Sequence, residues 1–223
     1  MVAFLAPVVM SALLLLARHF SSVASVTRFP DLVHNHAENM VLGILAYLPV
    51  AAIVPLALYL LDRTGQSPTF LGLGAPKLKE DLWPGMGLAA AAFGTELLLL
   101  VPLSIISRAD RSLFTTVKIG HVPAYYVIWG LAISIITAIA EEVLVNGYLT
   151  TRLGQLGWTA RSALVLSLVL RTSYHVYYGL GFILTIPFGF YVTRSFQKHR
   201  RLNRAIAAHF IFDATLFTLS ILH

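Results

Sequence analysis

Long apolar runs, separated by short polar segments, make up most of the chain. Inside a lipid bilayer every backbone polar group needs an internal hydrogen bond, so spanning runs form helices rather than open sheets. The pattern therefore predicts an all-α, polytopic membrane helical bundle of about seven transmembrane segments, in a single domain over residues 1–223. The predicted segments cover residues 2–17, 40–61, 85–106, 123–150, 162–175, then after a break at 177–181 on to 191, and 205–222.

The first run, residues 2–17, is uncharged and contains Pro7. It is either a cleaved signal peptide or a retained helix. A signal peptide normally carries basic residues before its apolar stretch, and none precedes this run, so we favour the retained helix.

The composition agrees with a membrane protein. Hydrophobic residues make up 57% of the chain and charged residues only 12%, whereas soluble domains carry about 25% charged residues. Because the chain has no cysteine, disulfide bonds and thiolate chemistry are excluded.

The net charge of +6 does not indicate a nucleic-acid partner, because the basic residues lie in segments beside the apolar runs. Cytoplasmic loops of membrane proteins are enriched in Lys and Arg. This bias predicts that segments 62–83, 151–161 and 194–204 share the cytoplasmic side. With its short loops, the chain is expected to be a multi-pass protein of a bacterial or archaeal plasma (cytoplasmic) membrane, with membrane lipid as a partner.

Candidate chemistry lies in three of the apolar runs, each of which carries polar residues four positions apart. Residues four apart share a helix face. An ionisable group at membrane depth costs roughly 2.5–3.5 kcal/mol, so such groups usually have a function. We expect these pairs to converge on one buried site next to Glu141. The pairs are Glu142 with Asn146, Arg171 with His175, and His209 with Asp213.

These residue types in a dry cavity can activate water. A carboxylate with a pKa brought towards neutrality serves as a general base, and a nearby histidine can share the proton or orient the water. A second histidine, here His209, can stabilise a developing oxyanion. Asp213, one turn later, could fix its tautomer. The combination fits peptide hydrolysis by a water nucleophile.

Other protease chemistries lack their parts. The sequence has no His-Glu-x-x-His zinc motif and no Gly-x-Ser-x-Gly elbow. A zinc site built from Glu141, His175 and His209 is the alternative to a metal-free site, since Glu and His are ordinary zinc ligands. We expect the metal-free site, without a cofactor.

Three motifs resemble those of one known family, the CAAX-protease and bacteriocin-processing (CPBP, or Abi) intramembrane glutamic endopeptidases. The family motifs are Glu-Glu-x-x-x-Arg, Phe-x-x-x-His and His-x-x-x-Asn/Asp. This chain has EEVLVN at 141–146, RTSYH at 171–175 and HFIFD at 209–213. The resemblance covers residues 123–220, the expected catalytic core.

The resemblance implies an α-helical membrane fold that admits a peptide segment. It implies that Glu141 activates water with help from His175, that His209 and Asp213 stabilise the oxyanion, and that Glu142 orients its neighbours. Family activities include cleavage of prenylated CAAX proteins and processing of bacterial peptides. Other members act in bacteriocin immunity or as membrane scaffolds.

The chain departs from the family pattern at two positions. Asn146 replaces the arginine of the first motif, and Arg171 replaces the phenylalanine of the second. One hypothesis is that the positive charge has moved between helices, so that Arg171 faces Glu142. A second hypothesis pairs Arg171 with Glu96, a lone carboxyl in the run 85–106. Tyr174 is expected to support the site or line a substrate path.

Three function classes stay open. The first is an intramembrane glutamic endopeptidase, similar to a metalloprotease, in which Glu/His-activated water hydrolyses a membrane-associated or prenylated peptide or protein. The second is a non-catalytic membrane scaffold or bacteriocin self-immunity protein on the same fold. The third is a small transporter or proton relay, for which an internal repeat would be expected. The sequence does not indicate an oligomeric state.

Overall fold

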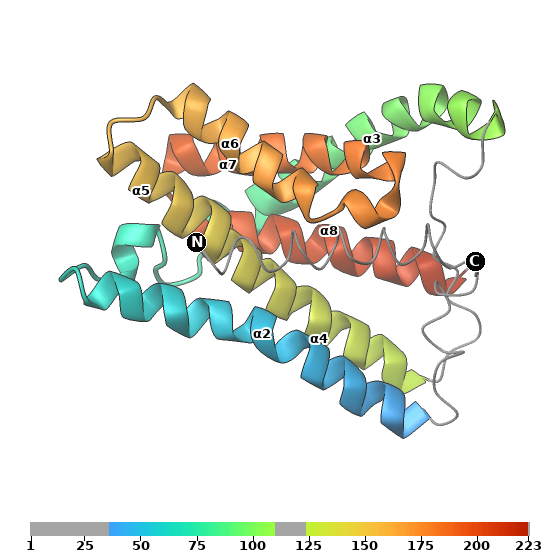
Figure 1. Cartoon of the computed structure of the whole chain (residues 1–223), viewed down its shortest axis with the longest axis horizontal. Helices are drawn as coiled ribbons and strands as arrows, with labels where there is room; N and C mark the ends of the chain where they lie inside the picture. Colours follow the sequence, from blue (N-terminus) through green and yellow to red (C-terminus); the bar gives the residue numbers. More distant parts are fainter. Residues whose placement is uncertain (1–35, 110–123, 223) are drawn as a thin grey trace.

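The computed structural model of the chain describes residues 36–109 and 124–222, and these are helical with no strand among them. Figure 1 shows the arrangement. The long helices are α2 (His36–Asp62), α3 (Trp83–Ala109), α4 (Ala124–Glu141), α6 (Ala160–Ser173), α7 (Thr185–His199) and α8 (Leu202–Leu222); the shorter elements are η2 (Pro68–Leu71), η3 (Leu78–Leu82), η5 (Glu142–Leu149), α5 (Thr150–Gln155), η6 (Val176–Tyr178) and η7 (Leu180–Leu184).

Helix α8 is the central element of the bundle. It packs against α3, α4 and α7, while α6 packs on α7 and α2 packs on α4. In Figure 1, α8 runs between the α6–α7 layer and the α2–α4 pair. The three polar pairs identified in the sequence lie on η5, at the end of α6 and just beyond it, and on α8, so this arrangement brings the three motif-bearing segments together.

Small residues allow the closest crossing, between α3 and α8. Ala89 and Ala92 on α3 and Ala205 and Ala208 on α8 are all buried. A Cβ added at Gly85 would lie only 3.0 Å from the Ala208 backbone nitrogen. Helices in membranes associate through such small-residue seams because lipid supplies no hydrophobic drive for their contact.

One end of the bundle gathers the basic segments. The Arg201 Nη2 atom lies 2.6 Å from Asp81 Oδ2, and Arg152 Nη1 donates to Gln66 Oε1 over 2.8 Å. Arg200 Nη2 also donates to the Thr151 hydroxyl over 2.9 Å. These contacts join segments 62–83, 151–161 and 194–204 at one end of the bundle. This agrees with the expectation that the three share one side of a membrane, and the cytoplasmic side stays a prediction.

The predicted all-helical class is confirmed among the described residues, but the predicted count of about seven spans is not. Two segments of the described chain, Leu78–Ile106 and Val127–Gln155, are long and apolar enough to cross a membrane, and Val50–Asp62 is a shorter apolar stretch. Large apolar side chains such as Leu98 (74% exposed) and Ile128 (72% exposed) face outward, as expected for lipid-facing positions. The predicted helix over 2–17 lies outside the described residues.

Two of the predicted polar loops are shorter than expected. Helix α7 continues to His199 and α8 begins at Leu202, so most of the basic segment 194–204 is helical. Likewise α5 extends the carboxylate-bearing helix to Gln155. The charged residues there lie at solvent-exposed helix ends, where polar side chains do not oppose a helix. The predicted break near 177–181 is confirmed, since two short 3₁₀ turns, η6 and η7, separate α6 from α7.

We expect Gly72→Ala to lower the free energy of unfolding by about 1–3 kcal/mol. Gly72 has φ +80, and an added Cβ would lie 2.5 Å from the Arg200 carbonyl oxygen, which would disturb the junction of η2 with the start of α8. Thermal unfolding in detergent micelles measures the change. Gly74→Ala is the control, because a Cβ there meets nothing within 4 Å; equal effects of the two variants would contradict this account.

Candidate active site

The carboxylate motif lies on a π-helical turn within one continuous helix. Helices α4, η5 and α5 follow one another without a break, and η5 has π-helical geometry. At its end the Thr150 N–H donates to the Val145 carbonyl, five residues earlier. Single π turns inside α-helices occur frequently at functional sites. Glu142 and Asn146 still lie side by side, as an ordinary helix face would place them, and their side chains are hydrogen-bonded.

Arg171 on α6 pairs with both adjacent carboxylates. Its Nη2 atom lies 2.8 Å from Glu142 Oε1 and its Nη1 atom lies 3.2 Å from Glu141 Oε2. Adjacent helical residues point about 100° apart, so a single planar guanidinium placed between them can use one nitrogen for each. The Arg171 residue is only 1% exposed. The charge that the first motif lacks at Asn146 is therefore supplied from the neighbouring helix.

Glu142 is the most enclosed member of the cluster. Its side chain is 0% exposed. Besides Arg171, its Oε1 atom lies 2.8 Å from His209 Nδ1, and its Oε2 atom accepts a hydrogen bond from the Asn146 amide. A carboxylate with partners from two other helices and from its own helix is fully satisfied. Glu142 thus ties η5 to α6 and α8.

Glu141 has a different environment. Its side chain is 18% exposed. The Tyr174 hydroxyl donates to Glu141 Oε2 over 2.6 Å, and this same oxygen receives Arg171 Nη1. Among the described residues, no hydrogen-bond donor is placed on Oε1. Both donors thus hold one oxygen of Glu141 while the other is left for a molecule that enters the site.

His209 on α8 lies between two carboxylates. Its Nδ1 atom lies 2.8 Å from Glu142 Oε1, and its Nε2 atom lies 3.4 Å from Asp213 Oδ2. Ionised carboxylates only accept hydrogen bonds, so a ring that donated to both would be a doubly protonated imidazolium. The Nε2 contact exceeds the usual hydrogen-bond length. Asp213, with a side chain 29% exposed, holds this N–H less firmly than Glu142 holds the other.

His175 lies where α6 ends. Its Nδ1 atom is 2.8 Å from the Arg171 carbonyl oxygen, so Nδ1 carries a proton and donates it. In a neutral ring the lone pair is then on Nε2, the tautomer that can accept a proton. The ring also contacts Tyr174 and stacks with Tyr178, at centroid distances of 4.8 and 5.9 Å.

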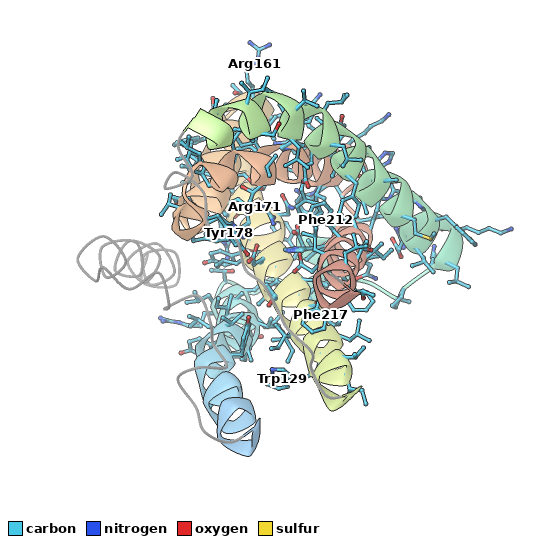
Figure 2. The ribbon with its side chains drawn as sticks, turned by 90° about the vertical axis from the view of Figure 1, so that its right-hand side faces the viewer. Trp129, Arg161, Arg171, Tyr178, Phe212 and Phe217 are labelled. Atoms are coloured by element: carbon cyan, nitrogen blue, oxygen red, sulfur yellow. The ribbon has the colours of Figure 1, made fainter. Side chains whose placement is uncertain are left out.

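Aromatic and small residues of α7 fix the position of Arg171. The Phe188 ring lies 5.6 Å from the Arg171 guanidinium carbon and 4.9 Å from the His209 ring centroid. A Cβ added at Gly189 would lie 3.0 Å from Arg171 Cδ. The guanidinium is therefore enclosed between α7 and the two carboxylates. Figure 2 shows Arg171 in the interior of the bundle, near Tyr178.

The structure decides between the two hypotheses for Arg171. Its pairing with Glu142 is confirmed. Its pairing with Glu96 is wrong, because the described ion pairs of Arg171 are those with Glu141 and Glu142, and Glu96 Oε1 is buried without a hydrogen-bond partner. Glu96 lies on α3, beyond α7, whereas η5 presents two carboxylates directly to α6.

The structure brings together the candidates named from the sequence. Direct contacts join Glu141, Glu142, Asn146, Arg171, Tyr174, His209 and Asp213, and His175 is linked through the Arg171 backbone. Sequence reasoning missed Tyr47 on α2, which interacts electrostatically with Tyr178, Asp213 and Glu141, and Phe188. In the sequence Tyr47 is marked only by its position within an apolar run. Tyrosines at membrane–water interfaces show the same pattern, so the sequence could not assign Tyr47 to the site.

A metal-binding arrangement is not seen in the part of the chain that the structure describes, where no three His, Asp or Glu side chains converge as ligands. Both nitrogens of His209 face carboxylates, and Nδ1 of His175 faces a carbonyl. Contacts of this kind at Nδ1 are also usual for histidines that bind a metal through Nε2, so the choice between a metal-free and a zinc site stays a prediction.

Comparison with protein families gives one match. Residues 123–215 match the family model described as type II CAAX prenyl endopeptidase Rce1-like. This range contains all three motif segments and the π turn. No curated protein and no solved structure matches the chain. The match confirms the family resemblance inferred from the three motifs.

We expect that the arginine that pairs with Glu142 can be moved from position 171 on α6 to position 146 on η5. Arg171→Phe alone removes the cation from buried Glu142, and breaking a buried ion pair typically costs about 3–5 kcal/mol. Adding Asn146→Arg returns a guanidinium one turn from Glu142 and recreates the family pattern at both positions. The double variant should therefore be more stable than Arg171→Phe, by thermal unfolding in micelles.

Asn146→Arg alone is the control for this cycle. It adds a second buried cation beside Arg171 and should destabilise the protein. Strong positive coupling between two destabilising changes is the expected result. If the two losses simply add, Arg171 does not replace the motif arginine.

Proposed function

Since residues 123–215 match the model of the type II CAAX prenyl endopeptidase Rce1-like family, we propose that this chain is an intramembrane glutamic endopeptidase. Its substrate is a membrane-associated or prenylated peptide or protein. The expected setting is the plasma membrane of a bacterium or archaeon.

The observation that carries the proposal is the difference between the two adjacent glutamates. Glu142 is fully enclosed and has partners on both oxygens, whereas Glu141 is partly exposed and holds its partners on Oε2 alone. Two carboxylates in different environments can take different roles. Glu142 organises the helices, and Glu141 meets the reacting water.

In the proposed reaction Glu141 accepts a proton from water as the water oxygen attacks the peptide carbonyl carbon. The carbonyl π electrons move to oxygen and form a tetrahedral oxyanion. The N–H of His209 Nε2 donates a hydrogen bond to this oxyanion and stabilises its negative charge. To do so, the N–H gives up its long contact with Asp213. When the C–N bond breaks, the proton held by Glu141 or passed through His175 goes to the leaving nitrogen.

Arg171 and Tyr174 are positioning residues in this scheme. Both bind Glu141 Oε2, so the carboxylate is fixed with Oε1 towards the water. Fixed orientation of a base is a large part of its catalytic effect. The chain supplies proton transfer and oxyanion stabilisation from its own side chains, and no metal enters the scheme.

A second candidate is a non-catalytic scaffold or immunity protein on the same fold. The observation that favours it is the mutual pairing of Arg171, Glu142 and His209, which also suits a purely structural ion-pair network. The exposure of Glu141 favours the enzyme, because a structural network gains nothing from an open carboxylate oxygen.

The test is cleavage of membrane-tethered and prenylated peptides in proteoliposomes, by wild type and Glu141→Gln. Glutamine keeps the shape and removes the base, and general-base catalysis contributes about 10²–10⁴ in rate. We expect a loss of at least 100-fold in kcat, with wild-type activity unchanged by chelator.

Glu96→Gln is the matched control, because it also neutralises a buried carboxyl in a membrane helix but touches none of the site residues. It should cleave at the wild-type rate. Loss of wild-type activity with chelator would support a metal enzyme instead. Full activity of Glu141→Gln would overturn the assigned base.

A further inference from the structure

An open pocket of about 560 Å³ lies at the basic end of the bundle, and none of the active-site residues lines it. Pro84 and Leu88 of α3 and Tyr191 of α7 form an apolar wall. Arg194, Lys198 and Arg204 supply positive charge from α7 and α8. The volume is within the range of small-molecule sites, about 300–1,000 Å³.

The cations of this pocket have no carboxylate partner within the described chain. Arg194 contacts only the Gln197 amide oxygen, at 3.5 Å. Arg204 Nε donates to a backbone carbonyl, that of Glu80, over 2.8 Å. The nearby carboxylates are already used, because Arg201 pairs with both Glu80 and Asp81. Asp81 also interacts electrostatically with Arg204, so the pocket holds an excess of positive charge that comes mainly from Arg194 and Lys198.

His199, which also lines the pocket, responds to this charge. Desolvation, followed by the positive charges of Arg204 and Lys198, lowers the pKa of His199. Arg204 and Lys198 therefore lie close enough to His199 to act on it. An anion would relieve the repulsion among these side chains.

The pocket lies at the level where a membrane meets water. Two exposed tryptophans lie near the pocket in the sequence. Trp83, 63% exposed, directly precedes the pocket residue Pro84, and Trp158, 47% exposed, lies two residues before the pocket residue Ala160. Exposed tryptophans concentrate at membrane–water interfaces. From Trp83, α3 continues into the segment Leu78–Ile106, which is long and apolar enough to span. The basic side chains therefore lie at headgroup depth and the apolar wall leads towards the acyl chains.

We propose that this pocket binds an anionic phospholipid, with the headgroup phosphate between Arg194, Lys198 and Arg204 and an acyl chain along Leu88 and Tyr191. Basic pockets between membrane helices on the cytoplasmic side bind such headgroups. Free phosphate shares the charge but would leave the apolar wall uncovered. A bound lipid would hold the ends of α3, α7 and α8 together, next to the helices that carry the active site.

The test uses the full chain in detergent micelles, with lipid binding followed by native mass spectrometry. The ligands are phosphatidylglycerol, phosphatidylcholine of matched chain length, and inorganic phosphate. Wild type should bind phosphatidylglycerol about tenfold or more tightly than phosphatidylcholine. Arg194→Gln/Lys198→Gln should abolish this preference, since each basic residue near an anionic surface contributes about fivefold in affinity and two contribute about 30-fold.

Lys79→Gln/Arg161→Gln is the matched control, because it removes the same charge from residues outside the pocket lining. Arg161 points away from the bundle in Figure 2. This variant should keep the preference for phosphatidylglycerol. Equal losses in the two double variants would mean general surface attraction and would overturn the site.

A third variant blocks the pocket without a change of charge. Ser195 lines the pocket, and Ser195→Trp should displace the lipid while thermal unfolding shows an intact fold. Retained lipid in this variant would overturn the proposal. Displacement of phosphatidylglycerol by millimolar inorganic phosphate would also overturn the proposal, because the pocket would then bind the free anion.

Discussion

The structure depends on one requirement, that two adjacent carboxylates buried in an apolar bundle be neutralised by a buried cation. An unpaired charge at this depth would cost several kcal/mol. Arg171 meets the requirement for both Glu141 and Glu142 with a single guanidinium. Its fork of nitrogens suits this geometry, whereas the single ammonium of a lysine would not. The positions of α4–η5, α6 and α8 relative to one another follow from this pairing and from the contact of Glu142 with His209.

Other local features serve the same arrangement. Gly189 leaves space for the Arg171 side chain, and Phe188 covers its guanidinium. The small residues of the α3–α8 seam hold α8 against α3, and α8 carries the His209 that contacts Glu142. At the basic end, contacts such as Arg201 with Asp81 close the bundle outside the apolar layer. The polar site is thereby held by packing on all sides, which is what a buried network needs to stay ordered.

The sequence predicted the helical fold, the convergence of the three polar pairs and the contact of Arg171 with Glu142, because spacing and the cost of buried charge are strong constraints. It did not predict the π turn, since no local residue pattern marks it. The sequence also could not predict that Glu141 and Glu142 differ in exposure. Their difference in exposure depends on which helices cover each side chain, and this is a tertiary property. The choice of Glu96 as a partner for Arg171 failed for the same reason.

The relocation of the cation has a consequence for the chemistry. An arginine in the family's first motif lies on the same helix as the glutamates, so its guanidinium moves with them. Here the cation belongs to the last turn of α6, and Tyr174 and His175 directly follow that helix. A shift of the α6 end relative to η5 therefore changes the contacts of Glu141 with Arg171 and Tyr174 together. The departure from the family pattern makes the orientation of Glu141, which we propose as the base, depend on one contact between η5 and the end of α6.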